Sequence, residues 1–175
     1  MTQYSLSLDS DRLNAGALLV READGAVRAA SRKEILTVAR ELVNVEELRG
    51  QDLSKPELVK EFLRLRLNAA LEHEVCGVIL LDSQNRLIDY VEPFRGTINQ
   101  ASVYPREIVK MALHHNALSV ILVHNHPSGV AEASQADIAL TRHLKQALAL
   151  VDVRLLDHFI VADSTVLSMA EQALF

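Results

Sequence analysis

The chain has 175 residues, of which 49% are hydrophobic, so we expect one domain with a sizeable core and room for a short appendage. It has no Trp and 4% aromatic residues, so the core must consist mainly of Leu, Val, Ile and Ala. The formal net charge of -5 argues against a broad basic surface that follows a phosphate backbone, although it allows a local basic patch.

The single cysteine, Cys76, excludes an intramolecular disulfide, which fits a reducing cytosol. Residues 1–16 carry early acidic side chains and lack the basic start and apolar centre of a signal peptide. No apolar run approaches the roughly 20 residues that a membrane helix requires. We therefore expect a soluble, cytoplasmic protein that does not contact a membrane.

The first third of the chain predicts a hairpin and a helix. Residues 17–28 could form a weak hairpin that turns at residues 24–25, an Asp-Gly pair. Ser31 and Glu34 form a capping-box pattern, and the apolar residues that follow have helical spacing. That helix is expected to end near Asn44.

A second helix is predicted after residues 49–52, whose Arg, Gly, Gln and Asp side chains predict a loop. Ser54 and Glu57 form a second capping-box pattern, with Pro56 in the tolerant first turn. The helix is expected to continue to about residue 72, with apolar positions at Leu58, Phe62, Leu65, Leu67 and Leu71.

A change of pattern follows. Residues 75–81 are a continuous apolar run, which indicates a buried strand. Residues 82–85 have turn composition and residues 86–92 predict a second strand, so the two strands should form a hairpin. Residues 93–102 are predicted as a loop.

The remaining elements alternate between helix and strand. In chain order they are a helix over 105–115, a buried strand over 119–123, a helix from Ser134 to about 150, a strand over 153–161, a short strand at 166–167 and a helical C-terminus. On the first of these helices, the residues expected on the buried side are Ile108, Val109, Ala112 and Leu113. This alternation from residue 74 onward predicts an α/β layered core. The preceding helical segment is expected to pack on it or to mediate association.

The most informative pattern is His124-x-His126 at the end of the strand over 119–123, followed by Ser134 and Asp137. Side chains two apart on an extended run point to the same side, so one metal ion can bridge both imidazoles. Ser134 and Asp137 alone would be interpreted as a helix cap. With the histidines upstream we favour Asp137 as a third ligand, because imidazole and carboxylate are ligands of zinc.

A hydrolytic site also needs a general base beside the water that it activates. Glu72 and Glu74 are the candidates, and Glu74 leads directly into the buried strand over 75–81. From composition alone, an exposed charge at a strand start is the more common outcome for Glu74.

Taken together, Glu74-x-Cys76-Gly77 and His124-x-His126-x7-Ser134-x2-Asp137 resemble the JAMM motif of the MPN+ metallopeptidases. Over roughly residues 55 to 175 the chain resembles the bacterial RadC family in particular. The matching segments are residues 81–83, 95–97, 103–107, 123–129 and 156–158. The resemblance implies an α/β MPN fold, with a mixed β-sheet flanked by helices, over residues 54–175, and a short, partly helical extension over residues 1–53.

The resemblance also implies roles for the motif residues. His124, His126 and Asp137 would bind Zn²⁺, with water as the fourth ligand. Glu74 would take a proton from that water and deliver it to the leaving amine, and Ser134 would donate a hydrogen bond to the oxyanion. The implied activity is that of a zinc metallopeptidase that hydrolyses a peptide or isopeptide bond in a peptide or protein substrate.

Two other kinds of function stay open. A RadC-like accessory role in DNA repair or processing is suggested by the family, but the acidic balance disfavours nucleic acid. Residues 1–53 also show no glycine-turn hairpin like the helix-hairpin-helix region of longer RadC proteins. A non-catalytic MPN scaffold would not need a complete ligand set. A zinc deaminase is disfavoured because it needs a Cys pair. The N-terminal helices could mediate a homodimer.

Other residues have mostly structural interpretations. His158 is equally compatible with support of a metal ligand and with a satisfied core position. His114 and His115 are expected to be solvated at a helix end, and His143 to be structural. Cys76 is most simply a small buried hydrophobe. Arg106 is a candidate contact for the substrate.

Overall fold

The computed structural model describes residues 18–31, 34–35, 38–39, 45–67, 73–96 and 103–175. The chain forms two compact units, Met1–Val43 and Asn44–Phe175, of which the second contains all the candidate site residues. The boundary between residues 53 and 54 that the sequence suggests stays a prediction. None of the described helices is both long and apolar enough to span a membrane.

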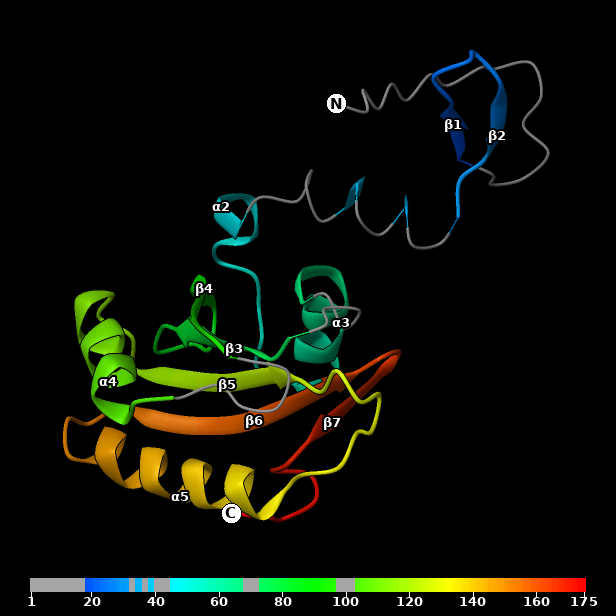
Figure 1. Ribbon diagram of the computed structural model, residues 1–175. Helices are drawn as coiled ribbons and strands as arrows, with labels where there is room; N and C mark the ends of the chain where they lie inside the picture. Colours follow the sequence, from blue (N-terminus) through cyan, green and yellow to red (C-terminus); the bar gives the residue numbers. More distant parts are fainter. Residues whose placement is uncertain (1–17, 32–33, 36–37, 40–44, 68–72, 97–102) are drawn as a thin grey trace. The chain divides into compact units, whose positions relative to one another are not determined.

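The first unit contains the predicted hairpin. Strands β1 (Leu19–Arg21) and β2 (Val27–Ala29) pair antiparallel, and Gly25 in the turn has a φ of 86° (Figure 1). The predicted capping box after it is also present, because Ser31 N donates to Glu34 Oε2 at 2.9 Å and Glu34 N donates to Ser31 Oγ at 3.3 Å. The expected end of this helix near Asn44 lies outside the described residues.

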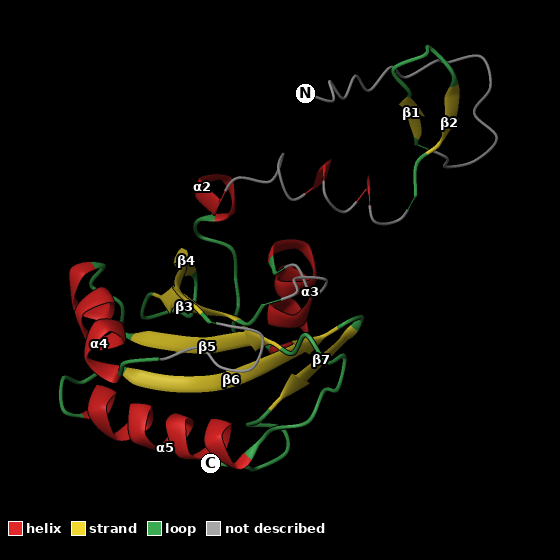
Figure 2. Ribbon diagram, in the orientation of Figure 1, coloured by secondary structure: helices red, strands yellow, loops and turns green. Residues whose placement is uncertain are grey.

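The second unit is a five-stranded mixed sheet with helices on both faces, in the order β4-β3-β5-β6-β7 (Figure 2). The strands are β3 (Val75–Leu81), β4 (Leu87–Arg95), β5 (Ser119–Asn125), β6 (Arg154–Ala162) and β7 (Thr165–Ser168). The helices are α2 (Val45–Leu48), α3 (Pro56–Arg66), α4 (Pro105–His114) and α5 (Gln135–Ala149). Only β5 and β6 pair parallel among the strands of this sheet, and the arrangement agrees with the predicted α/β, MPN-type fold.

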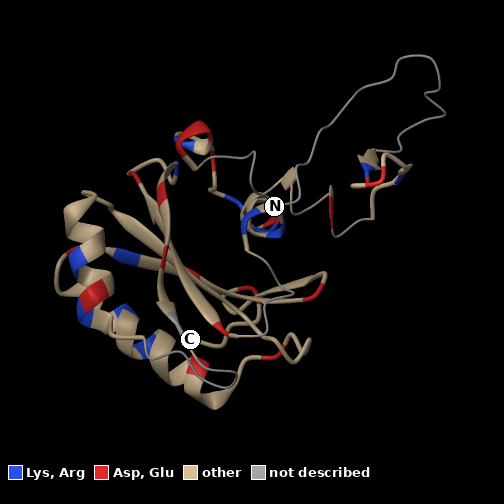
Figure 3. Ribbon diagram, turned by 45° about the horizontal axis from the view of Figure 1, so that its top comes forward, with Lys and Arg blue, Asp and Glu red and all other residues tan. Residues whose placement is uncertain are grey.

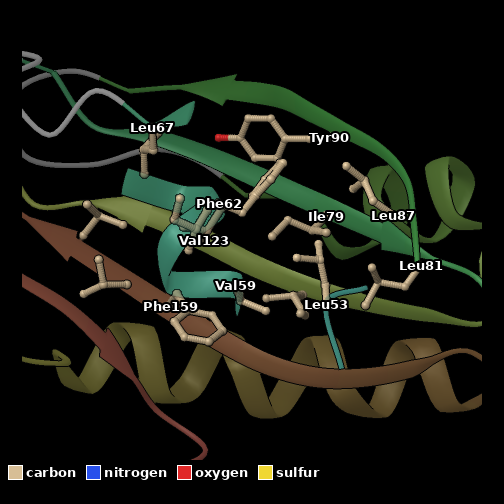
Figure 4. Close-up of a cluster of buried hydrophobic side chains, with 14 of the residues drawn as sticks. Leu53, Val59, Phe62, Leu67, Ile79, Leu81, Leu87, Tyr90, Val123 and Phe159 are labelled. Carbon is tan, nitrogen blue, oxygen red and sulfur yellow. The ribbon is translucent and has the colours of Figure 1, made fainter. Parts of the chain in front are cut away.

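Two core clusters lie on opposite faces of the sheet. On one face, Phe62 of α3 packs with Ile79 and other strand residues, as Figure 4 shows. On the other face, Ile108 of α4 and Leu144 of α5 pack with a second set of strand residues. Alternate residues of β3 enter the two clusters, so the whole strand is buried and its sequence is continuously apolar.

The start and end of α3 differ from the prediction. Lys55 is the N-cap and makes no side-chain cap hydrogen bond, so the capping box expected at Ser54 is wrong. The amide of Ser54 instead donates to Asp52 Oδ1 at 2.9 Å, in a local turn that precedes the helix. Leu67 is already extended, so the helix ends at Arg66 and not near residue 72. The buried side consists of Val59, Phe62 and Leu63.

Three further expectations were wrong. Strand β4 continues through Pro93, which was expected in a loop. The proline is tolerated because β4 is an edge strand, and because its pairing with β3 shifts register between Cys76 and Val78. On α4, Leu113 is 52% exposed although it was expected on the buried side. The C-terminal residues form turns, such as the one closed by the Ala173 amide on the Ala170 carbonyl, and not a helix.

Candidate metal centre

The two motif histidines meet at the carboxyl end of β5. This strand lies inside the sheet, between β3 and β6, so its end is held on both sides. The Nε2 atoms of His124 and His126 are 2.8 Å apart, as the alternation of side chains along the strand predicts. His124 is 3% exposed, and His126 is half-buried.

Asp137 approaches both histidines from the first turn of α5. Its Oδ1 is 3.3 Å from His124 Nε2, and its Oδ2 is 3.8 Å from His126 Nε2. One ligand atom from each of the three residues can be chosen so that all lie within 4.8 Å of one another. The structure therefore brings together the three ligands that the sequence suggests.

Ser134 is the N-cap of α5 and forms a reciprocal capping box with Asp137. Its Oγ accepts from the Asp137 amide at 3.1 Å and donates to Asp137 Oδ2 at 2.6 Å, and its own amide donates to Oδ2 at 2.8 Å. The hydroxyl proton of Ser134 is therefore engaged by the Asp137 carboxylate. Donation to another acceptor would require the hydroxyl to turn away.

The donor set suits a divalent cation. His126 Nδ1 is 2.8 Å from the carbonyl oxygen of Val130, and a carbonyl can only accept, so Nδ1 carries the proton and Nε2 is bare. That lone pair faces His124 Nε2 and a carboxylate. Burial lowers the pKa of His124 to about 4, against the opposing charge of Asp137, so this imidazole is neutral at pH 7 as a metal ligand must be.

Glu74 lies immediately before β3 and is half-buried. Burial, and then the negative charge of Asp137, raise its pKa, and a positive charge on His126 would act in the opposite sense. These interactions place the Glu74 carboxyl group in the electrostatic environment of the His124, His126 and Asp137 cluster. The other candidate base, Glu72, lies outside the described residues.

Asn125 belongs to this centre although the sequence reasoning overlooked it. It is fully buried between the two histidines, and its side chain reaches the segment that carries Glu74. Asn125 Oδ1 accepts from the Val75 amide at 2.7 Å, and Nδ2 donates to the His73 carbonyl at 3.1 Å. The sequence did contain one sign of its role, because Asn125 is a polar amide residue at the end of a mostly apolar strand.

The other histidines considered from the sequence differ in burial and in whether they contact a candidate ligand. His158 is fully buried, and its Nε2 is 2.8 Å from His124 Nδ1, so it contacts a candidate ligand directly. His143 is exposed on α5, and His114 is exposed at the end of α4. His115 is half-buried, with Nε2 3.4 Å from Asp89 Oδ2.

Cys76 and Arg106 were also considered from the sequence. Cys76 is buried, and burial raises the pKa of its thiol far from the reactive range. The guanidinium of Arg106 is exposed and lies 3.3 Å from Glu107. Cys76 lies opposite His124 in the pairing of β3 with β5, and its Sγ is 3.9 Å from the carbonyl oxygen of Gly77.

A mixed sheet with a His-x-His strand end, and an aspartate from the first turn of the next helix, defines a domain of the JAB/MPN class. Residues 53–174 match the family model of the RadC-like JAB domain, and the chain belongs to this family.

Curated relatives agree with this assignment. The chain is 51% identical over 148 residues to a UPF0758 protein of Cellvibrio japonicus, covering 85% of this chain and 66% of the relative. It is 53% identical over 150 residues to a UPF0758 protein of Methylibium petroleiphilum, covering 86% and 67%. It is 54% identical over 151 residues to one of Nitrosospira multiformis, covering 86% and 66%. The matched region spans about two thirds of the length of these relatives.

Proposed function

We propose that this chain is a zinc-dependent hydrolase of the JAMM type, which cleaves peptide or isopeptide bonds with a metal-activated water. One observation carries the proposal: the Nε2 atoms of His124 and His126 are 2.8 Å apart, with a carboxylate oxygen of Asp137 3.3 Å from the first. A metal ion bound between these three electron-pair donors would neutralise their mutual repulsion.

Zinc fits this donor set best, because two imidazoles and one carboxylate are typical of catalytic zinc sites, which keep a further position for water or substrate. A bound zinc ion would supply a water of lowered pKa and would polarise the scissile carbonyl. A purely structural zinc site would be expected to have four protein ligands, and the described residues offer a cluster of three.

Glu74 is the proposed general base and acid. It lies in the electrostatic environment of the cluster, and its raised pKa moves it toward the range in which a carboxyl group can both accept and return a proton near neutral pH. In this role Glu74 takes the proton from the attacking water and delivers it to the leaving amine, so that hydrolysis leaves one free amine and one carboxylic acid.

Ser134 is the proposed partner of Asp137 and a candidate donor to the oxyanion. Its contacts with Oδ2 orient the Asp137 carboxylate towards the histidines. The oxyanion role requires the hydroxyl proton to leave Asp137 during the reaction, so the two roles can be separated experimentally.

The proposed substrate is a peptide or protein. Nucleic acid is the less favoured partner because the net charge of the chain is -5. On α4 the basic residues also pair locally, since Glu107 lies 2.8 Å from Lys110 Nζ and 3.3 Å from Arg106 Nε. In Figure 3 the basic residues of α4 accordingly lie beside an acidic one. Whether two chains form a homodimer stays a prediction.

The test is metal analysis combined with turnover. Purified protein should bind one zinc ion per chain and cleave members of a panel of fluorogenic peptides and isopeptide-linked pairs. Chelation should abolish cleavage, and zinc should restore it. The variant H126A should lose zinc, while H143A, an exposed histidine on α5, should behave as wild type. Stoichiometric zinc without cleavage of any substrate would instead support the scaffold alternative, and cleavage that survives chelation would exclude the proposed mechanism.

A further inference from the structure

A buried chain of hydrogen bonds runs from His124 away from the candidate metal centre. His124 Nδ1 is 2.8 Å from His158 Nε2, and His158 Nδ1 is 2.6 Å from Thr141 Oγ1. Thr141 Oγ1 in turn donates to the backbone carbonyl of Asp137 at 2.5 Å. His158 and Thr141 are both fully buried, so water does not compete for these contacts.

The carbonyl group of Asp137, at the end of this series of hydrogen bonds, determines which atom donates and which accepts in each of them. The Asp137 carbonyl can only accept, so the single hydroxyl proton of Thr141 is used there. Thr141 Oγ1 must then accept from His158 Nδ1–H, which leaves His158 Nε2 bare. His158 Nε2 must therefore accept from His124 Nδ1–H, and the lone pair of His124 is left on Nε2.

The opposite direction is unfavourable. It would point the Thr141 proton at His158 Nδ1 and leave two acceptor oxygens, Thr141 Oγ1 and Asp137 O, 2.5 Å apart without a proton between them. The other acceptor near the hydroxyl, Met169 Sδ, is 3.9 Å away and is a weak one. The opposite direction would also put a proton on His124 Nε2, between that atom and His126 Nε2 2.8 Å away, and this proton would block the position that a metal ion needs.

The fold holds Thr141 and His158, the two middle residues of this series of hydrogen bonds, in place. Thr141 follows Asp137 by four residues on α5, so one face of the helix presents both. His158 lies on β6 opposite Leu122 of β5, and the Asp157 carboxylate accepts its backbone amide at 2.6 Å. The hydrogen bonds thus connect the ligand on β5 to the ligand-bearing turn of α5.

We infer that Thr141 and His158 are positioning residues, which hold His124 in the tautomer protonated on Nδ1 and so present the lone pair of Nε2 to a metal ion. This tautomer can be measured in the metal-free protein, where the contact with His158 competes with a proton placed between His124 Nε2 and His126 Nε2. Only the effect on metal affinity rests on the function proposed above.

The first test is the protonation of His124 in the metal-free protein, measured by long-range nitrogen–proton NMR of ¹⁵N-labelled histidines at alkaline pH. His124, assigned with H124Q, should carry its proton on Nδ1, and His158 should do the same. A proton on His124 Nε2 would overturn the inference. This measurement needs neither zinc nor a substrate, so it decides the inference even if the chain proves not to be a hydrolase.

The second test uses variants of Thr141. T141V keeps the shape but removes the hydroxyl, and should weaken zinc or Co²⁺ binding, measured by competition with a chromophoric chelator, by about 10–100-fold. T141S should restore nearly wild-type affinity, and T165V, at an exposed position of β7, should have no effect. Equal affinities of folded T141V and wild type would contradict the inference. If T141V does not fold, the NMR result on the wild-type protein decides.

Discussion

Asn125 Oδ1 accepts a hydrogen bond of 2.7 Å from the backbone amide of Val75, and Asn125 Nδ2 donates one of 3.1 Å to the carbonyl of His73. These two peptide groups flank Glu74. The same asparagine lies between His124 and His126 on β5. One buried side chain therefore connects the proposed general base to both histidines of the proposed metal centre.

We expect N125A to lower kcat by about 10–100-fold while zinc stoichiometry is kept, because the ligands remain and only the support of Glu74 is lost. Unpaired groups at Val75 and His73 should also lower the free energy of unfolding by about 1–3 kcal/mol. Activity, metal content and urea denaturation are the measurements, with the exposed Q146A as the control. Loss of zinc in parallel with activity would show that Asn125 acts on the histidines instead.

E74Q should reduce kcat by about 10²–10⁴-fold and leave zinc affinity nearly unchanged, since Gln cannot accept the proton. The pKa of Glu74 is raised in the folded state, so folding disfavours its ionised form, and this cost is present once the pH exceeds that pKa. The metal-free variant should therefore melt no lower than wild type at pH 7. The exposed E132Q serves as the control, and E74Q with full activity would remove Glu74 from the mechanism.

S134A should weaken zinc binding, because the Ser134 hydroxyl donates to the Asp137 carboxylate at 2.6 Å and orients it. Loss of the cap should also destabilise the protein by about 1 kcal/mol. Chelator competition and steady-state kinetics separate the two roles of this residue. A lower kcat with unchanged zinc affinity would identify Ser134 as the oxyanion donor, and S164A, in the exposed turn before β7, is the control.

The metal-free protein should lose stability as the pH falls from 6.5 to 5.5. Burial lowers the pKa of His124 to about 4 and the pKa of His158 well below its ordinary value. In this window the unfolded chain binds protons at both positions and the folded chain does not, so stability falls, by an amount on the order of 2 kcal/mol.

Urea denaturation at several pH values checks this expectation. The raised pKa of Glu74 acts in the opposite sense, so the comparison is best made in E74Q. H143A, which removes an exposed histidine, should show the same slope as its parent. A flat profile would mean that His124 and His158 titrate in the folded protein.

Local patterns in the sequence were enough for much of the site. The period of two along an extended run places His124 and His126 on the same side, and the Ser-x-x-Asp spacing places Asp137 in the first turn of α5. The continuous apolar run of β3 indicated that both of its faces are covered. Each of these properties depends on residues close together in the chain.

Tertiary structure decided the features that local patterns cannot encode. Pro93 is acceptable in β4 only because that strand lies at the edge of the sheet, and α3 ends at Arg66 although its apolar spacing continues. The contacts of Asn125 with His73 and Val75 span about fifty residues, and His158 reaches His124 from another strand. Sequence alone determined the candidate ligands and their spacing. Only the packing of β3, β6 and α5 around β5 decided which side chains support them, because hydrogen bonds between distant segments leave no periodic signal in the sequence.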